Sequence, residues 1–229
     1  MPVYQAITYT LTHSKRKTAS IYVERDGSVS VRVPQEFTDA QVKALLERKQ
    51  YWIHKHLAEW RLLNQAQVAR AFVSGEGFLY MGRTYRLQWV EQQAAPLLLK
   101  GGYFCLRRDP KTSREPAEAF KRFYSEKAQT KIGERVRHYA PQMGVTVNEV
   151  RVLELQHRWA SCSAKSNLNF HWKCMMAPLK IIDYIVVHEL AHLLVADHSP
   201  AFWREVDKVL PDYQERQGWL REHGAGLDL

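Results

Sequence analysis

Apolar residues in the first third of the chain recur with two different periods. Residues 4–12 and 19–33 are rich in β-formers and predict strands. From residue 38 onward the apolar positions change to a helical spacing, which predicts one long helix over 38–66. We expect its tryptophans, Trp52 and Trp60, to anchor a core rather than to serve as base-stacking platforms.

The middle of the chain predicts two β-hairpins followed by a second long helix. Residues 78–90 are typical of two short strands around a tight turn, and residues 97–106 repeat this pattern around Gly101-Gly102. An apolar stripe from Glu115 to about Tyr139 predicts the helix. Clean alternation of apolar and polar residues then predicts a strand over 167–173.

A linker-like segment, Asp109 to Ser113, separates two regions of different character. We therefore expect a β-rich basic N-terminal region at 1–112, which contains the long helix, and a second domain at 113–229. The class is α+β, since both regions mix helices and strands. The composition, with 45% apolar and 25% charged residues, is that of a soluble globular protein.

Several common settings are disfavoured by the sequence. No apolar run approaches the roughly 20 residues of a membrane span. The first residues, Met1 to Gln5, lack the charged and apolar regions of a signal peptide. Three cysteines form no disulfide framework, so a reduced, cytoplasmic location is expected.

The net charge of +9 is unevenly distributed along the chain. Residues 151–229 hold 9 Lys and Arg against 10 Asp and Glu, whereas residues 1–150 hold 24 against 14. A basic excess attracts anions, including nucleotides and nucleic acid, although it also serves solubility. Nucleic acid is therefore a candidate partner of the N-terminal half.

The helix predicted over 179–194 carries His188, Glu189 and His192 in an otherwise apolar run. Residues four apart lie on one face of a helix, so the two histidines can hold one metal ion. Glu189 projects about 100° away, yet it can reach a water on that metal. This spacing, two ligands plus a general base, is that of a zincin. A metal also removes the cost of burying three unpaired polar groups.

A third histidine, His198, follows ten residues after His188. On an unbroken helix it would lie about 15 Å further along the axis. It can join the site only if the chain turns back after about Val195. Asp197 suits such a turn, and Ser199-Pro200 is typical of the start of a new helix. Three histidines with water at the fourth position characterise a catalytic site for one zinc ion.

Hydrolysis at such a site also needs a group that stabilises the developing oxyanion. Arg158, His171 and Tyr184 are candidates in this sequence. Tyr184 lies four residues before His188 and so on the same helix face, where a buried core tyrosine is the alternative.

Four segments of the chain resemble the YgjP-like metallopeptidase family, which is related to the SprT-like and WLM zincins and to the minigluzincins. The resemblance implies a zincin-type domain with a backing helix, a small sheet and the HExxH helix. It also implies zinc ligands at His188, His192 and His198, with Glu189 as the base. Two departures, Ala160 where Gly is usual and His171 where Asn is frequent, leave the metal ligands intact. The segments are Arg158 to Ser163, Asn167 to Phe170, Ile182 to His192 and His198 to Trp203.

Three functions are compatible with this pattern. The first is a zinc-dependent peptidase, in which the polar face of the strand at 167–173 lies beside an extended peptide. The second is a metal-dependent nucleoside triphosphate pyrophosphohydrolase, resembling the UTP pyrophosphatase assignment of some relatives. The third is a DNA-associated protease like the SprT and WLM relatives, with the basic N-terminal half holding nucleic acid. An unpaired strand edge beside the metal would favour the peptidase.

Overall fold

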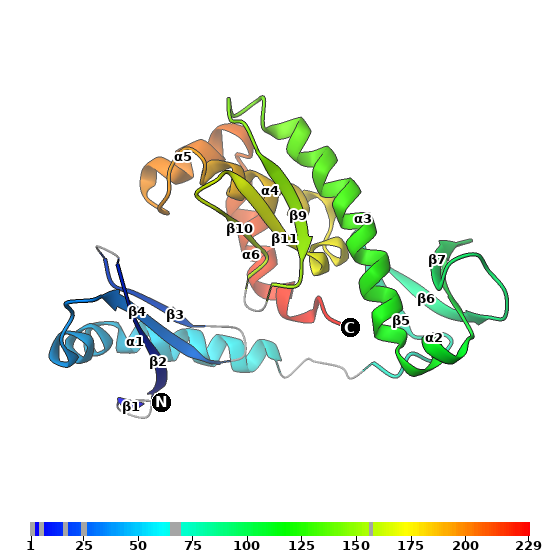
Figure 1. Ribbon diagram of the computed structural model, residues 1–229, viewed down its shortest axis with the longest axis horizontal. Helices are drawn as coiled ribbons and strands as arrows, with labels where there is room; N and C mark the ends of the chain where they lie inside the picture. Colours follow the sequence, from blue (N-terminus) through cyan, green and yellow to red (C-terminus); the bar gives the residue numbers. More distant parts are fainter. Residues whose placement is uncertain (1–2, 5–6, 16–17, 24–26, 65–69, 156–157) are drawn as a thin grey trace. The chain divides into compact units, whose positions relative to one another are not determined.

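Two compact units, Met1–Gln67 and Val68–Leu229, make up the chain. The structure is a computed structural model that describes all residues except 1–2, 5–6, 16–17, 24–26, 65–69 and 156–157, and only the backbone at 59–64 (Figure 1). Each unit has its own hydrophobic core, and the two cores share no residue. No helix in the described part of the chain is long and apolar enough to cross a membrane.

The division between the units differs from the boundary expected at 112/113. It falls at 67/68 because the hairpins of residues 77–107 pack into the core of the second unit. Phe78 and Phe104 lie 4.3 and 5.1 Å, between ring centroids, from Phe120 on the following helix. Aromatic packing of this kind fixes the hairpins to that helix.

The first unit is a four-stranded sheet with one helix. The strand order is β1-β2-β4-β3, in which β2 and β4 are parallel and β3 and β4 form an antiparallel hairpin. The helix buries one stripe, including Leu46 and Ile53, in the core that contains Ile7 and Val31. Residues 65–66 of the predicted helix lie outside the described residues. The elements are β1 (Val3–Tyr4), β2 (Ile7–Ser14), β3 (Ser20–Val23), β4 (Val29–Pro34) and α1 (Asp39–Asn64).

The expectation that Trp52 anchors the core is wrong. Its side chain is 39% exposed, and the neighbouring Tyr51 is 83% exposed. The buried stripe of α1 passes through Ile53, and consecutive residues on a helix point about 100° apart. Trp52 therefore lies at the edge of the solvent face. The side chain of Trp60 is outside the described residues.

A four-stranded sheet begins the second unit. It contains both predicted hairpins, β5–β6 and β7–β8, joined by parallel pairing of β6 with β8. The turn at Met81-Gly82 donates its two N–H groups to the carbonyl oxygens of Met175 and Met176, at 2.7 and 3.0 Å. The first hairpin thereby braces the segment that enters the metal-site helix. The elements are β5 (Gly77–Tyr80), β6 (Arg83–Val90), β7 (Leu97–Lys100) and β8 (Tyr103–Arg107).

The rest of the second unit has the zincin-like arrangement of a backing helix, a small sheet and a central helix, α4 (Figure 1). The backing helix α3 packs against β9, η1 and α4. Arg135 on α3 joins Asp183 on α4 through two hydrogen bonds of 2.6 and 3.1 Å. The elements are α2 (Pro110–Arg114), α3 (Pro116–Tyr139), β9 (Glu149–Leu153), β10 (Ala160–Cys162), β11 (Asn167–His171), η1 (Trp172–Met176), α4 (Leu179–Ala191), α5 (Pro200–Val209), α6 (Tyr213–His223) and η2 (Gly224–Gly226).

The small sheet has the order β10-β11-β9, with β11 parallel to β9 and antiparallel to β10. The strand predicted over 167–173 ends earlier, at His171. The reason is a cap, because His171 Nδ1 accepts a hydrogen bond from the N–H of Lys173 at 3.1 Å and so opens the 3-10 helix η1. Trp172 is buried in this helix rather than in a strand.

The contact of the β5–β6 turn with α4 predicts a strong effect of Gly82→Ala. At Gly82 φ is +77°, and a Cβ would lie 2.7 Å from Cγ of Pro178. Gly102, at φ +82° with open space around it, is the matched control. We expect Gly102→Ala to cost about 1–2 kcal/mol of stability. Gly82→Ala should cost about 1–3 kcal/mol more, because Pro178 must shift. Urea denaturation measures both, and equal losses would contradict a tight contact.

Candidate metal centre

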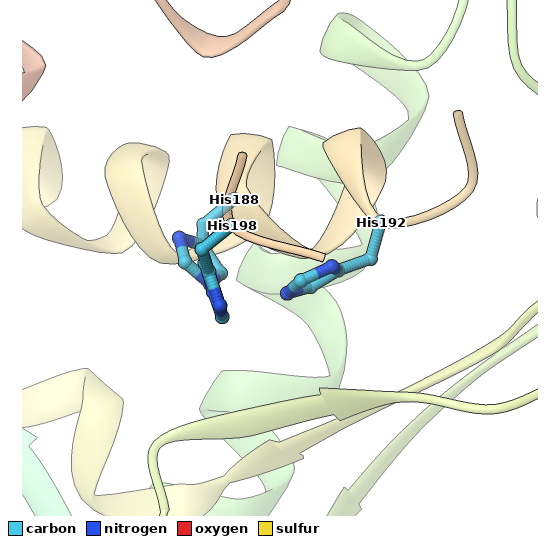
Figure 2. A group of neighbouring side chains, drawn as sticks. All are labelled: His188, His192 and His198. Carbon is cyan, nitrogen blue, oxygen red and sulfur yellow. The ribbon is translucent and has the colours of Figure 1, made fainter. Parts of the chain in front are cut away.

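Three imidazoles converge at the end of α4. His188 lies in the last full turn of the helix, His192 follows directly after it, and His198 comes from the loop that precedes α5. One ligating atom from each lies within 4.8 Å of the other two, and Nε2 of His188 is 3.0 Å from Nε2 of His198. Figure 2 shows the three rings pointing toward one another.

A chain reversal brings His198 back to the helix. The helix ends at Ala191, earlier than the predicted residue 194, and the N–H of Val195 still bonds to its carbonyl oxygen at 2.9 Å. Asp197 then accepts the N–H of Ser199 at 3.2 Å, a local turn bond of the kind expected for aspartate. This bond and that with the Ser199 hydroxyl lower the pKa of the Asp197 carboxyl. Ser199-Pro200 starts α5, as predicted.

The environment keeps all three imidazoles neutral. Burial, reinforced by its two histidine neighbours, lowers the pKa of His188 to about 3. Burial also lowers the pKa of His192 and of His198. Nδ1 of His192 lies 3.3 Å from the carbonyl oxygen of Val195, so this ring donates from Nδ1 and leaves Nε2 as an acceptor. Neutral imidazole with a fixed tautomer is the form that binds metal.

Two aromatic residues of α5 complete the site, and sequence reasoning gave them no role. The ring of Phe202 is fully buried and lies 4.6 to 4.9 Å, between centroids, from all three imidazoles. Trp203 stacks on His198 at 5.8 Å. The signal was present, because Phe202 follows His198 by four residues, one turn along a helix. These rings cover one side of the histidine cluster with apolar surface.

Glu189 is the buried carboxyl of the site. It is 6% exposed, and its Oε2 has no hydrogen-bond partner among the described residues. Burial raises the pKa of Glu189 to about 8, while the charge of Arg158 acts in the opposite direction. Arg158 is exposed and forms no ion pair with any side chain that the structure describes. Of the three oxyanion candidates, Arg158 is the one whose charge opposes the rise in the pKa of Glu189.

The other two candidates have structural partners. His171 is 7% exposed and caps η1 through Nδ1. Tyr184 is 5% exposed, and its ring lies 5.9 Å from that of His188. Burial raises the pKa of Tyr184 to about 12, although a hydrogen bond with Gln217 opposes this. Tyr184 thus packs behind His188, in the position of a core tyrosine.

The donor set fits a zinc ion. Zinc binds imidazole nitrogen at 2.0–2.1 Å, so two nitrogens at a tetrahedral angle lie about 3.3 Å apart. The 3.0 Å between His188 and His198 is close to this separation. A buried carboxylate oxygen without a partner lies on the residue next to a ligand, where a base for a metal-bound water is needed.

Comparison with known families decides the identity of the fold. A family model described as YgjP-like, metallopeptidase domain, matches residues 17–223. The chain belongs to the YgjP-like family. Its sequence resemblance to that family is thereby confirmed, and membership supports a metal-dependent peptidase. Comparison with curated proteins found no match.

Two solved structures are similar to part of this YgjP-like chain. One is the metallopeptidase zymogen abylysin of Pyrococcus abyssi, at 29% identity and a TM-score of 0.36. The other is the metallopeptidase zymogen jannalysin of Methanocaldococcus jannaschii, at 19% identity and a TM-score of 0.34. Each match covers 38% of this chain and 89% of the other.

The histidine cluster predicts a specific pattern of metal loss. We expect His188→Ala to bind almost no zinc, because its imidazole is the most buried of the three and contacts both others. His138→Ala, at an exposed histidine of α3, should retain about one zinc ion per chain. Elemental analysis after dialysis measures the stoichiometry. Full zinc occupancy in His188→Ala would exclude His188 as a ligand.

Proposed function

We propose that this YgjP-like chain is a zinc-dependent peptidase that binds its substrate as an added strand on β10. His188, His192 and His198 hold one zinc ion, and Glu189 is the general base. The observation that carries the proposal is that β10 is an edge strand of the small sheet, unpaired on its outer side among the described residues and beside the helix that bears Glu189. Strand and helix are in contact, and burial, together with the charge of Glu189, raises the pKa of the Cys162 thiol in β10.

The hydrogen bonds of β10 define which backbone groups are free. Residues 159 and 163 pair with β11. The N–H of His171 donates to the carbonyl oxygen of Trp159 at 2.7 Å, and the N–H of Ser163 donates to the carbonyl oxygen of Asn167 at 2.9 Å. Antiparallel pairs alternate between bonded and non-bonded, and the register places Ala160 opposite Phe170. The N–H and C=O groups of residues 160 and 162 therefore point away from the sheet.

The opposite edge of the same sheet is closed. Gln129 on α3 donates its side-chain amide to the carbonyl oxygen of Val150 at 2.9 Å. Its Oε1 accepts the N–H of Val152 at 3.2 Å. Both backbone groups belong to the outer edge of β9. An extended peptide can thus add to this sheet by β-augmentation only at β10, the edge next to the catalytic helix.

The residues of the site have separate tasks in hydrolysis. A zinc ion bound by the three histidines supplies a Lewis acid and lowers the pKa of a bound water toward about 7. Glu189 accepts the proton of the attacking water and later transfers it to the amine leaving group. Arg158 places a positive charge where negative charge develops. Phe202 and Trp203 hold the site dry, which strengthens these electrostatic interactions.

Hydrolysis of a nucleoside triphosphate is the competing function and makes a different demand on the site. A triphosphate needs several cations around it, in the way that kinases and ATPases provide them. A peptide substrate, by contrast, needs the free strand edge.

The peptidase proposal predicts the outcome of a direct assay. Zinc-loaded protein should cleave casein, and Glu189→Gln should lower kcat/KM by roughly 10²–10⁴-fold because the proton acceptor is lost. Zinc content should be unchanged, since Glu189 is not a ligand. A panel of nucleoside triphosphates is tested in parallel. Turnover of nucleotides alone, lost in Glu189→Gln, would assign the site to phosphohydrolysis instead.

Strand addition predicts sensitivity to the substrate backbone. In a cleaved peptide, N-methylation at the residue that pairs with Ala160 or Cys162 removes one inter-strand hydrogen bond. We expect kcat/KM to fall about 2- to 12-fold at alternate positions and to change little between them. A scan of singly N-methylated peptides measures this by mass spectrometry. A uniform response, without alternation, would contradict pairing with β10.

A further inference from the structure

The helix α1 of the first unit has an exposed face whose residues have no role in the proposed peptidase activity. At its centre Tyr51 is 83% exposed and Trp52 is 39% exposed. Arg48 and Lys55, both exposed, lie three and four residues from Tyr51. Residues at these spacings are neighbours on a helix surface, so the four side chains form one patch, the α1 patch.

The exposure of Tyr51 contrasts with the buried stripe of the same helix. The buried stripe of α1 is already complete with Val42, Leu46 and Ile53, each at most 1% exposed. Tyr51 lies on the opposite side of the helix from Leu46 and Ile53. Folding of this unit therefore does not account for the exposure of Tyr51 or for the cations beside it.

The patch carries two positive charges, those of Arg48 and Lys55. Arg48 and Lys55 form no ion pair with any side chain that the structure describes. Residues 1–67 as a whole hold 10 Lys and Arg against 6 Asp and Glu, a net charge of +4. Glu47, also exposed, lies four residues before Tyr51 and therefore on the same helix face as the two cations. The patch thus combines two cations with an exposed tyrosine and a partly exposed tryptophan, whose ring lies 4.4 Å, between centroids, from that of His56.

We propose that the α1 patch binds single-stranded nucleic acid. Arg48 and Lys55 contact backbone phosphates, and Tyr51 and Trp52 stack against unpaired bases. Proteins that bind single strands combine the same two elements, a cationic track and aromatic platforms. Arginine and lysine alone would suit duplex as well, but stacking requires bases that are free of a partner strand. The aromatic pair therefore selects the single strand.

The test is fluorescence anisotropy of the full-length chain with labelled oligothymidylate, oligouridylate and a duplex. We expect the single strands to bind and the duplex to bind more weakly. Tyr51→Ala/Trp52→Ala should weaken binding about tenfold or more without changing its salt dependence. Arg48→Ala/Lys55→Ala should weaken it and reduce the slope of log K against log salt by about 1.4. Tyr51→Phe/Trp52→Phe keeps both rings and should retain binding.

Matched controls lie in the second unit. Tyr103→Ala removes another exposed tyrosine, and Arg83→Ala/Lys100→Ala removes two other exposed cations. Neither should change oligonucleotide affinity appreciably. Thermal melting shows that each variant is folded. If Tyr51→Ala/Trp52→Ala fails to fold, Tyr51→Ala alone tests the stacking, because this side chain is almost fully exposed and its removal should not disturb folding.

Four outcomes would overturn the proposal. One is absence of binding at low salt, and another is equal binding of duplex and single strand. A third is full affinity in the variant without the two rings. The fourth is loss of self-association on removing the rings, seen by sedimentation without any oligonucleotide binding, which would assign the patch to a second copy of the chain. None of these outcomes concerns casein cleavage, so failure of the nucleic-acid proposal is distinct from failure of the peptidase proposal.

Discussion

The early end of α4 is the constraint on which the site depends. His188 and His192 share a helix face by periodicity alone, but His198 reaches them only because the helix stops at Ala191 and the chain reverses. Hydrogen bonds of the reversal act on the ligands themselves, since the carbonyl of Val195 holds Nδ1 of His192. The same reversal starts α5 and so delivers Phe202 against all three imidazoles. This one turn therefore positions the third ligand, fixes the tautomer of His192 and places Phe202 against the imidazoles.

A helix that carries buried polar groups must also be held firmly, and two contacts do this. Arg135 pairs with Asp183 and fixes the first half of α4 to α3. The β5–β6 turn bonds to Met175 and Met176, directly before the helix begins. The bidentate pair of Arg135 and Asp183 carries a desolvation cost, but it allows only one relative orientation of α3 and α4. These contacts place His188 and Glu189 precisely, which matters because catalysis is sensitive to small displacements.

Local patterns predicted most elements of the fold and most of the metal centre. Both hairpins, the backing helix and the turn at Asp197 follow from spacing and turn chemistry between near neighbours in sequence. Three features escaped, for different reasons. The unit boundary is set by packing of Phe78 and Phe104 on Phe120, and β10 is too short for periodicity to detect. The end of β11 is set by a histidine cap that the alternation concealed.

The two edges of the small sheet connect fold to function. An exposed strand edge is a liability in a soluble protein, because it can pair with other chains. Here Gln129 satisfies the outer backbone groups of β9, so one edge has been closed by a side chain from the backing helix. The edge of β10, beside Glu189, has no such cover among the described residues. A peptide that binds as an added strand needs this asymmetry. With the edge of β9 closed and that of β10 open, an extended peptide can pair only on the side of the sheet where the metal ligands lie.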